Sequence, residues 1–238
     1  MDELGKIKDE LGKNANPERA KGAQRYFKTG KGQYGEGDIF IGVSGPQQRK
    51  IAKIHYQNFS FDEIQQLLNS KIHEYRQTAL FILCEKYKHA KKDNFLRKQI
   101  YEFYLKNTSR INNWDLVDCS APTIIGDFAL KEGTNTIRFL SKSNNIWERR
   151  IAIISTAALL KERNFGETLF IADVLINDEH DLIHKAVGWM LREIGKRNMK
   201  VLELFLSTRY KKMPRTMLRY AIEKFPEEKR KKYLKGKI

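Results

Sequence analysis

Apolar residues recur along most of this chain at the three- and four-residue spacing of an α-helix with one buried face. Strand-like alternation is confined to a short run at 38–43, DIFIGV. Helix-start signals agree with the periodicity: Asn16 stands before Pro17 as a cap before a first-turn proline, and Ser60 and Glu63 form a capping box. The pattern therefore predicts an all-α protein.

One stretch interrupts the helical pattern. Residues 29–46, TGKGQYGEGDIFIGVSGP, are rich in glycine and end in proline, a composition that favours loops. We expect this loop to connect the first helices to the rest of the chain. The chain as a whole, 1–238, is predicted to be a single domain.

Four segments repeat the same order of a cation followed by apolar residues. Aligned on one cation each, they are separated by 73, 35 and 31 residues, the aligned positions being Arg76, Arg149, His184 and Arg215. The first interval is about two repeats, and the missing unit would begin near Asn112. A period in the thirties to forties is typical of an α-solenoid of HEAT-like helix-pair repeats. Cations at one phase would then line a basic concave groove.

The charge of the chain points to a polyanionic partner. Among 238 residues, 45 Lys and Arg face 29 Asp and Glu, a formal net charge of +16. In HKAVGWMLREIGK one helical face carries three cations around an indole that is expected to be exposed: Lys185, Trp189, Arg192 and Lys196. A basic stripe with an aromatic residue is typical of nucleic-acid binding. A generic basic surface and a protein-binding solenoid stay as alternatives.

Other patterns restrict the chemistry. Cys84 and Cys119 lie in apolar helical segments, which indicates buried free thiols in a reducing compartment. The sequence has no Cys/His spacing for zinc, no P-loop and no dinucleotide-binding glycine pattern, so we expect neither metal nor cofactor. No apolar run approaches a membrane span, and the N-terminus lacks a secretory apolar core. We expect a monomer in the cytoplasm, associated with the nucleoid.

Two further motifs supply candidate reactive groups. Trp114 and Asp118 in NNWDLVDCS share a helical face, whereas Asp115 has a different phase. Arg150 lies three residues after Trp147 in NNIWERRIAI. Taken singly, these residues have ordinary structural explanations, namely an inter-helix packing aromatic for Trp114 and a cap or ion pair for Asp118.

Together they suit one reaction. An N-alkylated purine in DNA is already cationic, so it leaves without protonation, and the sugar becomes oxocarbenium-like. A carboxylate such as Asp118 can stabilise that sugar and orient water, and the indoles of Trp114 and Trp189 can favour the cationic base. Arg150 would hold a phosphate near the lesion.

The chain resembles the AlkD-type DNA alkylation repair glycosylases, which are built from HEAT-like repeats. The resemblance runs from PERAKGAQRYFK at 17–28 to MPRTMLRYAI at 213–222, and its most specific motifs are WDLVD, IWERRIAI and KAVGWMLRE. It implies that Asp118 is the catalytic carboxylate, that Trp114 and Trp189 cradle the lesion, and that Arg150 contacts the backbone nearby. Arg192 and Lys196 would grip phosphates, and Tyr26 would lie near the lesion.

The family resemblance also implies a substrate and a mechanism. The expected partner is double-stranded DNA with N3- or N7-alkylated purines, and the expected activity is monofunctional, metal-free excision without base flipping. Three departures affect substrate range: Asn113 replaces an aromatic, Ser44 replaces an amide, and the segment 29–46 is longer than its counterpart. The alternative is a non-catalytic protein that binds distorted or branched DNA, although the retained Asp118 argues against it.

Overall fold

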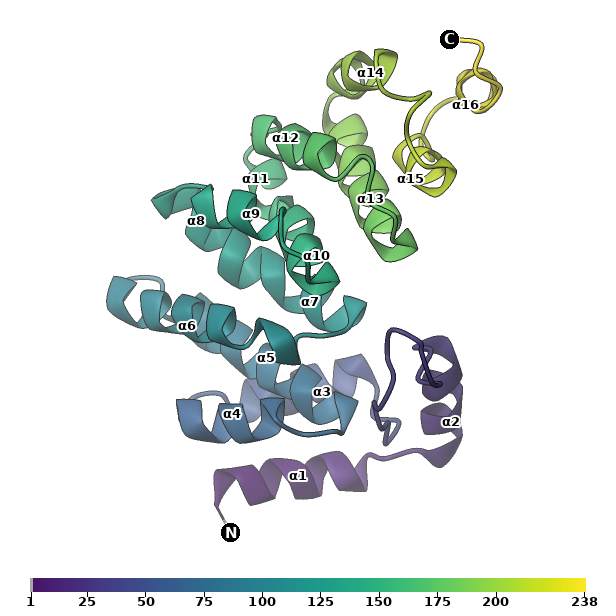
Figure 1. Cartoon of the computed structure of the whole chain (residues 1–238). Helices are drawn as coiled ribbons and strands as arrows, with labels where there is room; N and C mark the ends of the chain where they lie inside the picture. The colour runs from purple at the N-terminus through teal and green to yellow at the C-terminus, as the bar shows by residue number, and fades with distance from the viewer. Residues whose placement is uncertain (1) are drawn as a thin grey trace. The chain divides into compact units, whose positions relative to one another are not determined.

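The computed structural model describes residues 2–238, and its regular secondary structure is helical (Figure 1). Over this range no strand forms, and Ile39 and Ile72 make only an isolated parallel bridge. The chain divides into two compact units, an N-terminal unit that ends at Ser120 and a C-terminal unit that begins at Ala121. The predicted all-α solenoid class is confirmed, and the single domain over 1–238 stays a prediction.

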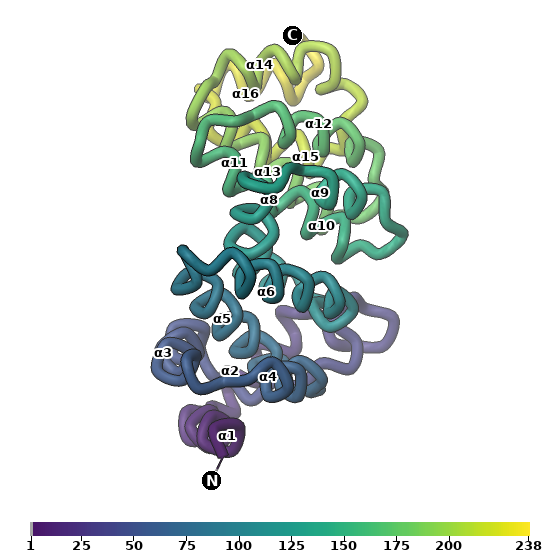
Figure 2. Tube along the Cα trace, turned by 90° about the vertical axis from the view of Figure 1, so that its left-hand side faces the viewer, coloured from purple at the N-terminus to yellow at the C-terminus, as the bar shows by residue number. Residues whose placement is uncertain are grey.

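The N-terminal unit is organised around one long buried helix, α5 (His73–His89), which packs against α3 and α4 (Figure 2). Asn16 caps α2 by accepting a hydrogen bond from the Arg19 amide at 2.9 Å, and the capping box of α4 forms as predicted. The remaining elements are α1 (Glu3–Lys13), α2 (Pro17–Tyr26), α3 (Gly45–His55), α4 (Phe61–Leu68), α6 (Asn94–Lys106), a 3₁₀ turn (Thr108–Arg110) and α7 (Trp114–Ala121), which reaches the unit boundary.

The C-terminal unit is organised around α13 (Asp181–Arg197), which packs against α10, α14 and α15. Its apolar face is buried through Val187, Met190, Leu191 and Ile194, whose spacing in the sequence is that of one helical face. The other elements are a π turn (Pro122–Gly126), α8 (Asp127–Glu132), α9 (Asn135–Leu140), α10 (Ile146–Ser155), α11 (Ala157–Lys161), α12 (Gly166–Val174), α14 (Met199–Ser207), α15 (Arg215–Ala221) and α16 (Glu227–Leu234). No helix within residues 2–238 has the length and apolar character to cross a membrane.

Residues 29–44 of the glycine-rich segment lie outside the helices, between α2 and α3, as predicted, whereas its last two residues, Gly45 and Pro46, begin α3. Its run 38–43 forms no strand because its backbone amides bond to the start of α5 instead. The buried carboxylate of Glu74 accepts from the amides of Ile41 at 3.1 Å and Gly42 at 2.7 Å. Gly42 has φ +81°, and a Cβ there would lie 2.0 Å from the Asn16 carbonyl oxygen. The segment is therefore fixed to the N-terminal unit.

Three of the four aligned residues stabilise the turns before their helices, whereas the fourth, Arg215, is the first residue of α15. Arg76, Arg149 and His184 are each the fourth residue of their helix, and each side chain bonds the backbone carbonyl six residues earlier. Arg76 Nη1 donates to Ser70 at 3.1 Å and Arg149 Nη1 to Ser143 at 2.9 Å. The common phase thus reflects a common turn before the helix. A groove lined by these side chains stays a prediction.

Candidate functional site

A cavity of about 500 Å³ opens in the N-terminal unit, between α2, the end of the glycine-rich segment, α5 and the start of α7. This volume is within the range of roughly 300–1,000 Å³ that is usual for small-ligand sites. Aromatic and polar side chains both line it, the aromatic ones being Tyr26, Phe27, Phe40 and Trp114 and the polar ones including Gln48, Glu74, Gln77 and Asp115. The structure therefore brings Tyr26 and Trp114, both predicted to lie near a lesion, to one cavity.

The aromatic rings form a continuous stack. The Phe27 ring stacks on Trp114 at a centroid distance of 5.1 Å and on Phe40 at 5.0 Å. Phe40 stacks in turn on the imidazole of His73 at 4.5 Å. Tyr26, which is 67% exposed, meets Trp114 edge to face at 5.8 Å. The contacts with Phe27 and Tyr26 thus fix the position of the Trp114 indole.

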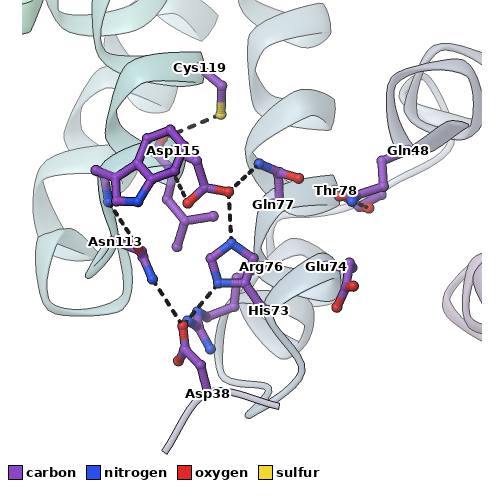
Figure 3. Close-up of polar contacts among 12 residues, drawn as sticks. Asp38, Gln48, His73, Glu74, Arg76, Gln77, Thr78, Asn113, Asp115 and Cys119 are labelled. Carbon is purple, nitrogen blue, oxygen red and sulfur yellow. Dashed lines mark hydrogen bonds and ion pairs between the residues drawn. The ribbon is translucent and has the colours of Figure 1, made fainter. Parts of the chain in front are cut away.

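A buried polar network adjoins this stack through His73, and Figure 3 shows its contacts. The imidazole of His73 bonds Asp38 through Nδ1 at 2.9 Å and Asp115 through Nε2 at 2.8 Å. Gln77 donates to the same Asp115 oxygen at 2.7 Å, and Arg76 donates to Asp38 at 2.7 Å. None of these contacts joins neighbours in sequence, since the two histidine bonds span 35 and 42 residues.

The network determines the protonation of its members. Burial alone would lower the pKa of His73, but the charge of Asp115 and the hydrogen bonds to Asp115 and Asp38 outweigh it and raise this pKa to about 9. For Asp38, burial raises the pKa, whereas hydrogen bonds and charges from His73 and Arg76 lower it below its usual value. His73 is therefore an imidazolium at neutral pH, between two carboxylates.

The proposed catalytic carboxylate lies on the same helix as Trp114. Asp118 is half-buried on α7, one turn after Trp114, and is not part of the cavity wall. Asp115, which has a different helical phase from Asp118, lines the cavity together with Trp114. Sequence reasoning missed Asp38, His73 and the role of Asp115, because their contacts depend on segments that meet only in the folded chain.

On α13 the predicted stripe is present, but its charges are paired. Trp189 is half-buried rather than exposed. Each cation contacts an acidic residue of the C-terminal unit: Lys185 bonds Asp181 at 2.7 Å, Lys196 bonds Glu193 at 2.6 Å and Arg192 pairs with Glu223. Pairs of this kind near solvent contribute little stability, typically about 0–1 kcal/mol, so a phosphate can compete for the same cations.

The two arginines of α10 both donate hydrogen bonds to backbone carbonyls. Arg149 Nε donates to Asp178 at 2.6 Å, in addition to its backbone bond. Arg150 is 5% exposed, and its Nη1 donates to the Leu182 carbonyl at 2.6 Å. Their contacts to DNA stay predictions.

Cysteine and metal-ligand chemistry give no second site within the described part of the chain. Cys84 is buried and Cys119 half-buried, and neither forms a disulfide. No group of three or more His, Cys, Asp and Glu side chains in residues 2–238 has the geometry to hold a metal ion.

Most of the chain matches one family of known proteins. The family model described as DNA alkylation repair enzyme matches residues 7–225. The chain belongs to this family. The resemblance to AlkD-type proteins is thereby confirmed, and DNA alkylation repair is the function to which the family is assigned.

Solved structures show the same fold. The predicted DNA alkylation repair enzyme from Enterococcus faecalis superposes with a TM-score of 0.68 and 17% identity, covering 90% of this chain and 98% of the other. AlkD2 from Streptococcus mutans superposes with a TM-score of 0.57 and 21% identity, covering 77% and 91%. No curated protein matches the sequence significantly.

Proposed function

We propose that this repair protein is a DNA glycosylase that releases cationic N3- and N7-alkylated purines from double-stranded DNA. The observation that carries the proposal is the placement of Trp114 and Tyr26 at one cavity, with Asp118 one turn further along α7. Membership of the DNA alkylation repair family supports it.

The chemistry is a simple hydrolysis. The bond between C1′ and the purine nitrogen breaks, and its electron pair neutralises the positive charge of the base. Water then forms the new bond at C1′, and Asp118 accepts its proton after stabilising the oxocarbenium-like sugar. Since the base is already a good leaving group, neither a general acid nor extrusion into a deep pocket is required, unlike the usual case for glycosylases.

The indole of Trp114 would favour the cationic nucleotide through its electron-rich face. Its packing against Phe27 and Tyr26 limits the freedom of the ring, so little side-chain entropy is lost on binding. For the C-terminal unit we propose the roles that the family resemblance implies, with Trp189 as a second aromatic, Arg150 near the lesion, and phosphate contacts from Arg192 and Lys196. From the basic stripe and the repeat pattern we propose Lys185 and Arg149 as further contacts to DNA.

The test is a base-release assay under single-turnover conditions, with protein in excess over duplex DNA carrying 7-methylguanine or 3-methyladenine. We expect release of the free base above the spontaneous rate. Asp118→Asn should remove most of the release while leaving DNA affinity nearly unchanged, because it removes charge at the sugar and no phosphate contact. The matched control is Asp62→Asn, an exposed carboxylate on α4, which should behave as wild type.

Absence of release from both substrates would contradict the proposal. If the protein instead bound branched DNA more tightly than duplex DNA without releasing any base, the non-catalytic alternative would be favoured.

A further inference from the structure

The glycine-rich segment reaches the start of α7 through one buried carboxylate, Asp38. Its oxygens accept hydrogen bonds from His73 at 2.9 Å, from Arg76 at 2.7 Å and from Asn113 at 3.4 Å (Figure 3). Asp38 is 8% exposed and Asn113 is fully buried. Asn113 directly precedes α7 and accepts from the Trp114 amide at 2.8 Å. One side chain of the loop thus contacts both α5 and the residue that begins α7.

A second connection runs through His73 to the first turn of α7. His73 Nε2 bonds Asp115 at 2.8 Å, and Asp115 also accepts from Gln77 of α5 at 2.7 Å. Asp115 lies between Trp114 and Asp118 in sequence, directly after the first and three residues before the second. A displacement of the Asp115 carboxylate therefore displaces the turn that carries both proposed site residues.

The histidine can make both bonds only as an imidazolium. Neutral imidazole has one N–H donor, whereas both Asp38 and Asp115 accept when ionised. The charged groups that face His73 are Asp38 from the loop, Arg76 from α5 and Asp115 from α7. From the other side it is covered by rings, with Phe40 at 4.5 Å and Phe27 at 5.1 Å.

We propose that Asp38, His73 and Asp115 are positioning residues that orient the first turn of α7, so that Trp114 faces the cavity and Asp118 has its working position. This inference rests on the proposed glycosylase function for its kinetic consequence. It also assigns a role to the glycine-rich segment, because this segment supplies Asp38, the buried carboxylate at one end of the hydrogen-bond network.

The first test needs no DNA. The indole N–H resonance of Trp114, identified by its loss in Trp114→Phe, should move in Asp38→Asn and in Asp115→Asn. It should stay unchanged in Glu167→Gln, which removes one partner of the ion pair between Glu167 and Arg138 in the C-terminal unit. In wild type the same resonance should shift with pH, with a midpoint of about 9, as His73 loses its proton. That titration tests whether the network positions Trp114 even if neither aspartate variant folds.

A Trp114 resonance that ignores the pH change, or that keeps its wild-type position in both folded variants, would overturn the proposal. A network with a purely structural role would lower the melting temperature and leave this resonance unchanged.

The second test is kinetic. Asp38→Asn and Asp115→Asn should lower the single-turnover rate of base release on the order of tenfold or more, since a displacement of about 1 Å is costly in a reaction that depends on geometry. The Kd for DNA should remain within about twofold, because neither residue contacts phosphate in this scheme. The alkaline limb of the pH profile should move to lower pH in Asp38→Asn, because the imidazolium loses a counter-charge.

Glu167→Gln should lower stability and leave rate and pH profile unchanged. Wild-type rates per folded molecule in both aspartate variants would refute the positioning role. If the wild-type protein released no base at all, the proposed function would fail, and the indole resonance would still decide whether the network positions Trp114.

Discussion

His73 shows how the fold determines the charge of a single residue. It is 1% exposed, yet it bonds two carboxylates, and its pKa is raised to about 9. A buried imidazolium without these partners would lose its proton. The two aspartates therefore offset the free-energy cost of burying a charged imidazole, and His73 in turn connects the loop, α5 and α7.

This link predicts a pH dependence of stability. The folded pKa of His73 lies above its unfolded value, so its contribution is fully present below about pH 6.5 and is lost as pH rises through about 9. The loss should be on the order of 3 kcal/mol in the free energy of unfolding. Urea denaturation at a series of pH values measures it, and His73→Gln should flatten the curve in this window. An equally steep decline in that variant would show that other groups are responsible.

Two glycines of the same segment provide a matched pair. Gly42 and Gly37 have φ of +81° and +84°, but only at Gly42 would a Cβ meet backbone, 2.0 Å from the Asn16 oxygen, whereas at Gly37 nothing lies within 4 Å. Gly37→Ala should cost roughly 1–2 kcal/mol through its backbone conformation alone. Gly42→Ala should cost about 3 kcal/mol or more, because the loop must also move. Thermal denaturation compares them, and equal losses would disprove the close contact.

At the scale of elements, the same side-chain contact stabilises the turns before α5, α10 and α13. An arginine or histidine at the fourth helical position bonds the carbonyl six residues earlier and holds the chain as it enters the helix. Such carbonyls would otherwise need water or another donor. The repeat visible in the sequence is therefore a repeat of helix entries, each with its own buried apolar face.

Helix packing in the C-terminal unit depends on Gly188. A Cβ there would lie 2.5 Å from both the Met217 oxygen and the Tyr220 Cβ of α15. Gly188→Ala should therefore separate α13 from α15 and destabilise by about 1–3 kcal/mol. The control is Gly22→Ala in α2, where nothing lies within 4 Å, and there the same change should stabilise by about 0.5–1 kcal/mol. Chemical denaturation of both variants should give shifts of opposite sign, and shifts of the same sign would refute the packing argument.

At the scale of the whole molecule, the dominant property is its charge of +16. A surplus of this size makes DNA binding depend strongly on salt, since each neutralised phosphate releases a counterion. Many of the cations are paired with acidic residues on the surface, so binding must exchange these pairs for phosphates.

A salt titration can identify the cations that take part. Lys196→Gln on α13 should lower the slope of log Kd against log salt by about 1, if Lys196 grips a phosphate. Lys13→Gln on α1 is the matched control, because Lys13 is also paired with an acid on its own helix, at 2.6 Å from Asp9. It should leave the slope unchanged, and identical slopes for all three proteins would remove Lys196 from the interface.

The sequence by itself determined the helical class, the loop between the first helices and the rest, and the buried face of α13. These features depend on local periodicity, caps and glycine content, which residues a few positions apart already encode. The placement of Trp114 and Asp118 on one helix could likewise be predicted, because the two residues are only four positions apart.

Only the tertiary structure decided which side chains meet across segments. It joined Asp38, His73 and Asp115, buried Arg150, and turned Arg76 and Arg149 toward their own backbone. The physical reason is that a charged side chain can be solvated by water, by a carboxylate or by a carbonyl, and the choice depends on groups that are distant in sequence and near only after folding.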